Sequence, residues 1–273
     1  MKRDEKTIQY TAVDERAGIP IEVVYPGVNV EKYQSPPTSL GRALSSVGQL
    51  PPEGDEGGPT IGFFYRMSYE NGLDILAQSF VKLKNENSIP GLKLKIGGGY
   101  TRENRGFINN IRNILQPYMD DVIWSDNYTL DEHPAFYKDI SLICVPLRFN
   151  EAVGLYLCEA FAAGRPAVAP DTGSFGEIIQ NAGVLYSPND SEHLTEALKK
   201  ILLNNTLYEK CRENALRLSH ERYNDRVVAG KLLEIYRASL TSAPSSSPPA
   251  VSELAPTAPS SPIFSAASSG FPL

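Results

Sequence analysis

The chain has 273 residues, of which 41% are hydrophobic and 21% are charged, and its formal net charge is -6. This composition predicts a globular protein with a packed core, and it argues against non-specific binding to nucleic acid or to anionic membranes. The start lacks the apolar core of a signal peptide, and no uninterrupted apolar run approaches the ~18 residues of a membrane span. The three cysteines form neither a metal-binding nor a disulfide pattern, so we expect a cytoplasmic protein.

Composition separates a central region from two atypical segments. Residues 35–59 are rich in Pro and Gly without periodicity, which is typical of a linker. More than half of residues 241–273 are Ser or Pro, and such a segment buries too little apolar surface to offset its ordering entropy. We therefore expect one folded domain at residues 60–240 and a disordered tail after it.

Within residues 60–240, short β-rich runs alternate with helical patterns. Strands are predicted at residues 60–67, 92–98, 121–126, 141–147, 166–171 and 183–188. Helical patterns lie between them, and two long helices are predicted at about 191–203 and 206–240. Alternating strands and helices of these lengths predict an α/β domain with a single doubly wound parallel sheet.

Polar residues and glycines follow the predicted strands. In a doubly wound sheet, ligands bind beyond the carboxyl ends of the strands, where the strand order reverses. The residues found there include Arg66, Asn71, Gly97, Gly98, Gly99, Asp126, Arg148, Glu151, Gly154 and Asp171. The three consecutive glycines lack the dinucleotide-binding fingerprint, so a flexible turn and a ligand contact are equally good interpretations of them. The gathering of polar residues on one rim predicts a ligand site.

A phosphate site is predicted at the start of one helix. Gly154 opens a helical pattern directly after a strand, and the free N–H groups and positive dipole end of a helix suit a phosphate oxygen. Arg66, at the tip of the neighbouring strand, is placed to supply a bidentate cation for a diphosphate. Taken alone, an arginine there would more often form a surface ion pair.

Two glutamates flank this helix start. Glu151 precedes the helix and Glu159 lies inside it, and eight helical steps span at most roughly 12 Å. Carboxylates that hydrolyse one bond together lie about 5–9.5 Å apart. The longer spacing favours two carboxylates that hold the hydroxyl-rich ends of an extended ligand. The simpler alternative is an amphipathic helix with solvated acids.

The run PLRFNEAVGLYLCEAFAAGRPAVAPDTGSFGEII, residues 146–179, resembles the E-x7-E region of retaining, nucleotide-sugar-dependent glycosyltransferases of the GT-B fold, family 4. The resemblance extends over most of residues 19–240 and is to their carboxyl-terminal half, a Rossmann-like domain. It implies that Glu151 contacts the donor sugar, Glu159 the ribose and Arg66 the diphosphate. It also implies a UDP-, GDP- or ADP-sugar as donor and no metal cofactor.

The expected site follows from this resemblance and from the rim. We expect catalytic roles for Glu151 and Arg66. The expected donor-binding residues are Arg66, Asn71, Gly98, Asp126, Val153, Gly154, Leu155 and Glu159. The three histidines, His133, His193 and His220, are expected to be solvated surface residues.

The sequence departs from the family pattern at several positions. The family's diphosphate-binding lysine is Asn71 here, and the glycine before the arginine is Tyr65. Leu147, Val153 and Ser174 replace a serine, a phenylalanine and a glycine. The missing lysine is expected to weaken either diphosphate binding or the stabilisation of the leaving group, and it puts full activity in doubt.

A further expectation concerns the acceptor, whose identity the sequence does not give. In the family it binds to an amino-terminal domain, whereas only about 20 residues precede the resembling region here. We therefore expect residues 1–34 to be a remnant of the interdomain segment and Ile21–Tyr25 to be a strand without its usual sheet. A separate chain would supply the acceptor domain, docked beside residues 21–28 and the last helix. Two alternatives stay open, a nucleotide-sugar- or partner-binding pseudoenzyme and a GT-B sugar epimerase.

Overall fold

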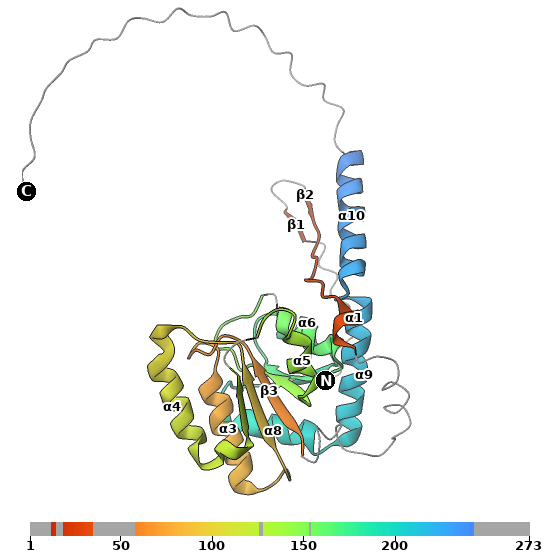
Figure 1. Ribbon diagram of the computed structural model, residues 1–273. Coiled ribbons are helices and arrows are strands. Elements are labelled where there is room, and N and C mark those ends of the chain that lie inside the picture. Colours follow the sequence, from red (N-terminus) through yellow and green to blue (C-terminus); the bar gives the residue numbers. More distant parts are fainter. Residues whose placement is uncertain (1–11, 15–18, 35–57, 126–127, 153, 243–273) are drawn as a thin grey trace, which may run out of the picture.

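The computed structural model describes residues 12–14, 19–34, 58–125, 128–152 and 154–242 (Figure 1). Apart from two residues of each, the expected linker at 35–59 and the expected tail at 241–273 lie outside the described residues. Two expected site residues, Asp126 and Val153, also lie outside them.

Six parallel strands form the central sheet, in the order β5-β4-β3-β6-β7-β8. They are β3 (Thr60–Phe64), β4 (Lys93–Gly97), β5 (Val122–Ser125), β6 (Leu142–Cys144), β7 (Ala167–Pro170) and β8 (Gly183–Tyr186). Each strand lies inside the run predicted for it, which confirms the doubly wound parallel sheet. The strand order reverses between β3 and β6, so the ligand crevice of this fold class is expected between the loops that follow these two strands.

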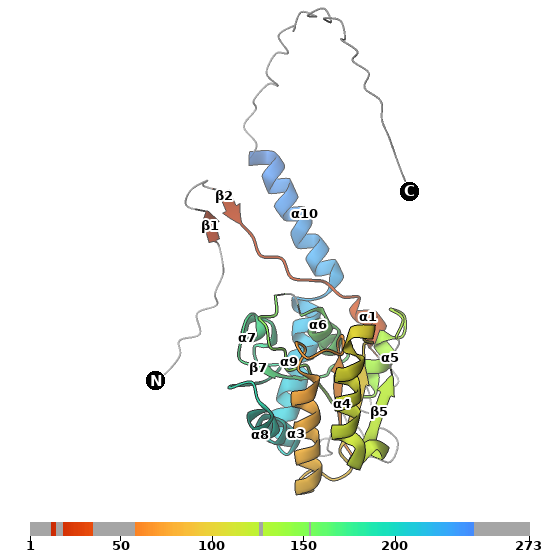
Figure 2. The ribbon, with the colours of Figure 1, turned by 90° about the vertical axis from the view of Figure 1, so that its left-hand side faces the viewer.

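Helices cover the sheet. They are α1 (Val30–Tyr33), α3 (Leu73–Glu86), α4 (Arg105–Leu115), α5 (His133–Lys138), α6 (Leu155–Ala162), α7 (Phe175–Ile179), α8 (Ser191–Leu202), α9 (Asn205–Glu221) and α10 (Asp225–Ser242), with 3-10 turns at Arg102–Asn104 and Gln116–Asp121. Helix α3 packs against α4 and α8, while α6 packs against α9, α5 and α1 (Figures 1 and 2). All five residues of β3 are buried, as expected for a strand covered on both faces.

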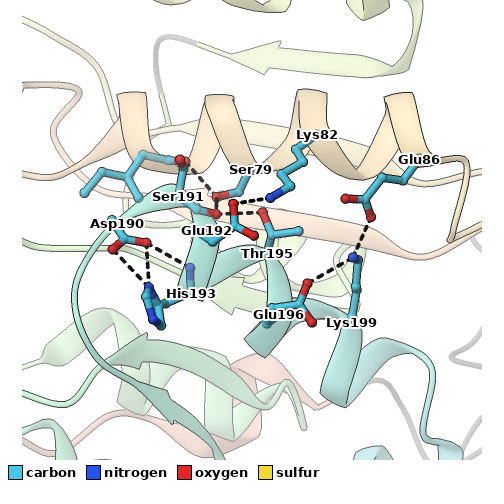
Figure 3. A network of polar contacts seen from close by, with 11 residues as sticks. Ser79, Lys82, Glu86, Asp190, Ser191, Glu192, His193, Thr195, Glu196 and Lys199 are labelled. Atoms are coloured by element: carbon cyan, nitrogen blue, oxygen red, sulfur yellow. Dashed lines mark hydrogen bonds and ion pairs between the residues drawn. The ribbon is translucent and has the colours of Figure 1, made fainter.

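Polar contacts join α3 to α8 (Figure 3). The Ser79 hydroxyl donates to the carbonyl of Ser191 at 2.9 Å, and Lys199 pairs with Glu86 at 2.5 Å. Lys82 forms a third cross-helix contact, with Glu192. Helix α8 begins at Ser191, where the Asp190 carboxylate accepts the His193 N–H at 2.9 Å and caps the helix. These contacts fix α3 against α8.

The single long helix predicted for residues 206–240 is wrong, because the chain breaks it into α9 and α10. Tyr223, in the break, is fully buried and its hydroxyl donates to the carbonyl of Ile178 at 2.9 Å. The Val28 N–H donates to the Tyr223 carbonyl at 2.8 Å, and the Asp225 N–H donates to the Val28 carbonyl at 3.0 Å. Val28, which is distant in sequence, thus hydrogen-bonds to backbone groups that would bond within a continuous helix. Local periodicity does not indicate this contact.

The amino-terminal segment divides at residue 28. Strands β1 (Ala12–Asp14) and β2 (Ile19–Ile21) form an antiparallel hairpin, and the strand expected at Ile21–Tyr25 does not form beyond Ile21. Val28 and Val30 instead join the hydrophobic core of the domain. Helix α10 projects from the body (Figures 1 and 2), and the described side chains along it are exposed or half-buried. None of the helices in the described ranges has the length and apolar character needed to cross a bilayer.

Candidate functional site

A cavity of about 520 Å³ opens at the point where the strand order reverses. It is lined by Phe64, Tyr65, Arg66, Gly98, Gly99, Tyr128, Leu130, His133, Glu151, Gly154, Leu155, Tyr156 and Glu159. These residues come from the ends of β3, β4 and β5, from the loop after β6, and from α5 and α6. The volume lies in the range of small-molecule sites, roughly 300–1,000 Å³.

Most of the residues expected from the sequence meet in this cavity. Arg66, Gly98, Glu151, Gly154, Leu155 and Glu159 all line it. Asn71 is 3% exposed and is absent from the lining, and its side-chain amide donates to the carbonyl of Arg66 at 2.5 Å. Asn71 therefore holds the backbone of Arg66 and does not line the cavity.

Arg66 is exposed and forms no salt bridge within the part of the chain that the structure describes. Among the lining residues it is the one arginine or lysine. An exposed guanidinium on a cavity wall is suited to a bidentate anionic group such as a phosphate.

Glu151 is 8% exposed and lies in the loop between β6 and α6. Its Oε1 accepts the Ala152 N–H at 2.8 Å, and its carbonyl accepts both the N–H (3.1 Å) and the hydroxyl (2.5 Å) of Ser174. Burial raises the pKa of Tyr65, and the Glu151 carboxylate raises it further by its charge and by a hydrogen bond. Tyr65 therefore stays protonated and donates to Glu151 across the neutral pH range.

Glu159 is 7% exposed and accepts hydrogen bonds from three side chains. The hydroxyls of Tyr33 and Tyr137 donate to its Oε1 and Oε2 at 2.8 and 2.9 Å, and His133 Nδ1 lies 3.1 Å from Oε1. The pKa values of both tyrosines are raised, first by burial and then by the negative charge of Glu159. Glu159 is thus an organised buried carboxylate, which excludes the interpretation of a solvated acid on an amphipathic helix.

His133 departs from the expectation of a solvated surface residue, whereas His193 and His220 are exposed as expected. It begins α5, its ring meets Phe64 edge-on with 4.7 Å between ring centres, and it faces Glu159. No spacing in the sequence links residues 133 and 159, because the contact depends on how α5 packs against α6.

The helix start at Gly154 has the geometry expected for an anion site. Gly154 is the N-cap of α6 with φ +61°, a left-handed conformation that favours glycine. The N–H groups of Leu155 and Tyr156, in the first turn, have no partner inside the helix. Both residues line the cavity together with Glu151 and Arg66. A phosphate between Arg66 and this helix end would meet the guanidinium on one side and N–H donors on the other.

The glycine run after β4 has a clear structural reason. Gly98 has φ +115°, and a Cβ there would lie 2.3 Å from the carbonyl oxygen of Tyr65. The chain beyond β3 pairs with the glycines, since the Met67 N–H donates to the Gly99 carbonyl at 2.9 Å. Gly98 and Gly99 also line the cavity, so the turn brings bare backbone to the ligand side.

Several lining residues were missed by the sequence interpretation. They are Phe64, Tyr65, Tyr128, Leu130, His133 and Tyr156. Tyr156 had a usable signal, because it lies three residues before Glu159 and side chains at that spacing share a helix face. Tyr65 directly precedes Arg66 at a strand end and was noted only as a departure. Across the described residues, no group of three or more His, Cys, Asp or Glu side chains is placed to hold a metal ion.

Similar proteins show how much of a known protein this chain represents. YtcC of Bacillus subtilis, a putative glycosyltransferase, is 25% identical over 227 residues, which are 81% of this chain and 55% of that protein. Alr3699/HepE of Anabaena, solved in complex with UDP and glucose, has a TM-score of 0.63 at 17% identity, covering 80% of this chain and 57% of that one. The C-terminal domain of LpcC from Francisella tularensis has a TM-score of 0.58 at 19% identity, covering 73% of this chain and 100% of that domain.

The structural likenesses show a shared GT-B Rossmann-like fold. The chain spans about half the length of the curated relatives, such as YtcC and the D-inositol 3-phosphate glycosyltransferase of Salinispora arenicola. Residues 51–218 match the family described as "Glycosyl transferases group 1". This match covers more than half of the chain, which therefore belongs to the group 1 glycosyltransferases and represents their carboxyl-terminal domain.

Proposed function

We propose that this chain is the donor-binding part of a retaining glycosyltransferase of family 4 that uses a nucleoside diphosphate sugar. One observation carries the proposal: Glu151, Glu159, Arg66 and the start of α6 line the same cavity where the strand order reverses. An extended ligand with a hydroxyl-rich group at each end and a diphosphate in the middle satisfies all four. A solved neighbour, Alr3699/HepE, was captured with UDP and glucose, which supports this ligand class.

Each group has a role that follows from its chemistry. Glu159 would accept hydrogen bonds from the ribose hydroxyls, and Glu151 would accept them from the transferred sugar. Arg66 and the N–H groups of Leu155 and Tyr156 would stabilise the negative charge that develops on the diphosphate as the bond to the sugar breaks. These donors supply the positive field from the chain itself, and we expect transfer of a hexose without a metal cofactor.

A second candidate function is nucleotide-sugar binding without turnover. It is favoured by Asn71, which is buried beneath Arg66 and adds no cation to the cavity. With one guanidinium facing the diphosphate, charge stabilisation of the leaving group is weaker than with an arginine and a lysine. Asn71 thus bears on the rate of transfer more than on whether the ligand binds.

The acceptor site is proposed to lie outside the described residues. The chain covers 57% of Alr3699/HepE and 55% of YtcC. We propose that an acceptor-binding part docks beside residues 21–28 and α10, where Val227, Leu233, Tyr236 and Leu240 are exposed. Three buried free thiols, Cys144, Cys158 and Cys211, fit the reducing cytoplasm as the location.

The ligand class is tested by calorimetric titration of the purified chain with UDP, GDP and ADP and with UDP-glucose, GDP-mannose and ADP-glucose. We expect at least one diphosphate to bind. Arg66→Ala should weaken it by roughly tenfold or more, because a hydrogen bond to a charged group contributes about 1.5–3 kcal/mol. Arg217→Ala serves as the control, since Arg217 pairs with Glu221 on the exposed surface of α9.

Equal affinity of wild type and Arg66→Ala would refute the placement of the diphosphate. Turnover with the matched donor and a panel of acceptors then separates the two candidate functions. We expect slow or no transfer by the 273-residue chain until an acceptor-binding part is added, because most of the rate comes from holding the acceptor against the donor. Efficient transfer by the chain alone would contradict the proposed acceptor placement.

A further inference from the structure

Arg148 and Asp74 form the most complete ion pair near the cavity. The two guanidinium nitrogens of Arg148 donate to the two carboxylate oxygens of Asp74 at 2.8 and 2.7 Å. The guanidinium carbon lies 3.8 Å above the centre of the Tyr69 ring, and the same group donates to the Tyr69 carbonyl. The two side chains are only 25% and 15% exposed. A bidentate, stacked and partly buried pair is far more directional than an ordinary surface ion pair.

The pair joins the two loops that build the site. Asp74 lies in the first turn of α3, at the end of the loop that carries Arg66, whereas Arg148 lies three residues before Glu151 in the loop after β6. The Arg148 N–H also donates to the carbonyl of Glu70 at 2.9 Å. The two loops are therefore connected by side-chain and backbone contacts, although neither Asp74 nor Arg148 lines the cavity.

The distance between Arg66 and Glu151 depends on this connection, since the two residues come from different loops. Within the first loop, Asn71 fixes the Arg66 backbone through its 2.5 Å contact. Within the second, Ser174 fixes the Glu151 backbone. A ligand that spans both needs the loops themselves held in register, because positioning errors of about 1 Å at a site cost much of its function.

We propose that the Arg148–Asp74 pair is a positioning pair that holds the Arg66 loop against the Glu151 loop, so that diphosphate and sugar are bound together. This inference rests on the proposed function. Its specific consequence concerns the gain in affinity that the sugar adds to the bare diphosphate. That gain reports on the position of Glu151, because the bare diphosphate is already held by Arg66 and the start of α6.

The chain offers a matched control on the same helix. Glu86, at the other end of α3, pairs with Lys199 of α8 at 2.5 Å, with side chains 33% and 22% exposed (Figure 3). Neither residue lines the cavity. Glu86→Gln therefore removes an ion pair that anchors α3 to a neighbouring helix without touching the two site loops.

The experiment compares wild type with Arg148→Lys, Asp74→Asn and Glu86→Gln. Arg148→Lys keeps the charge and removes the bidentate geometry, and Asp74→Asn is a second variant in case the first folds poorly. For each protein, the affinities for UDP and UDP-glucose, GDP and GDP-mannose, and ADP and ADP-glucose give a ratio of sugar-bearing to bare ligand. Melting temperatures are measured in parallel.

We expect Arg148→Lys and Asp74→Asn to lower this ratio on the order of threefold to tenfold, and Glu86→Gln to leave it unchanged. In a Glu151→Gln background, Arg148→Lys should have no further effect on the ratio, because the contact that it positions is already lost. An unchanged ratio in Arg148→Lys and Asp74→Asn, with diphosphate binding intact, would overturn the positioning role alone. Failure of wild type to bind any diphosphate would instead overturn the proposed function, and the positioning role with it.

Discussion

At the scale of single residues, the site is defined by the donors that surround each glutamate. Glu159 accepts from Tyr33, Tyr137 and His133, which come from α1 and α5 and lie far from it in sequence. An ionised carboxylate offers about four acceptor positions, so three internal donors leave room for a ligand hydroxyl. The same contacts stabilise the fold, because a buried carboxylate without donors would be costly.

Tyr137→Phe is expected to lower the free energy of unfolding by about 1.5–3 kcal/mol, since it removes a hydrogen bond to a charged group. Tyr223→Phe is the matched control, because Tyr223 is equally buried and its hydroxyl donates to a neutral group, the Ile178 carbonyl, at 2.9 Å. That bond is worth only about 0.5–1.5 kcal/mol. Urea unfolding of the three proteins measures both losses, and an equal cost for the two substitutions would contradict the larger contribution of the Tyr137–Glu159 hydrogen bond.

At the scale of elements, the junction between α9 and α10 ties the amino-terminal segment to the domain. Tyr223 fills the core at this break, meets the ring of Tyr25 edge-on with 5.8 Å between ring centres, and has Val28 bonded to its carbonyl. The break therefore sets where the domain body ends and where α10 leaves it (Figures 1 and 2). Residues 28–33 belong structurally with the domain, since α1 packs on α5 and α6.

Replacing Tyr223 by alanine is expected to cost about 3–5 kcal/mol of unfolding free energy, as for other large aromatic side chains in a core. Tyr236→Ala provides the comparison, because Tyr236 lies on α10 and is 61% exposed. A surface substitution of that kind should stay within about 0.5 kcal/mol of wild type. Chemical denaturation distinguishes the two, and a small loss for Tyr223→Ala would mean that the junction contributes little to the stability of the domain.

At the scale of the whole molecule, the sequence was sufficient for the sheet and for the rim on which Arg66, Glu151 and Gly154 line one cavity. Buried parallel strands produce uniform apolar runs, and residues that follow such strands must meet on one rim, so Arg66 and Glu151 could be placed together. Glu159 lies inside α6 and was placed by its spacing from Glu151 and by the family resemblance. The sequence was not sufficient for contacts set by packing between distant elements. Three features depend on partners that no local sequence pattern indicates. They are the break at Tyr223, the inward position of His133 and the hydrogen bond from Asn71 to the backbone of Arg66.

The matched family and the geometry describe one half of a glycosyltransferase architecture. Its sheet places the Arg66 loop and the Glu151 loop side by side, and the Arg148–Asp74 pair connects them. We propose that one ligand reaches from Glu159 to Glu151, with its diphosphate between them. This arrangement predicts that substitutions of the two glutamates affect ligand affinity differently, although both residues are buried and both lie next to α6 or within it.

The most direct test measures the affinity of Glu159→Gln and Glu151→Gln for a free nucleoside diphosphate and for the matching nucleotide-sugar, after melting curves have shown that both variants are folded. Glu159→Gln should weaken both ligands by roughly tenfold or more, because both contain the ribose. Glu151→Gln should weaken binding of the nucleotide-sugar alone, because only that ligand carries a sugar that reaches Glu151. The same loss of affinity for both ligands in both variants would contradict a ligand that reaches from Glu159 to Glu151.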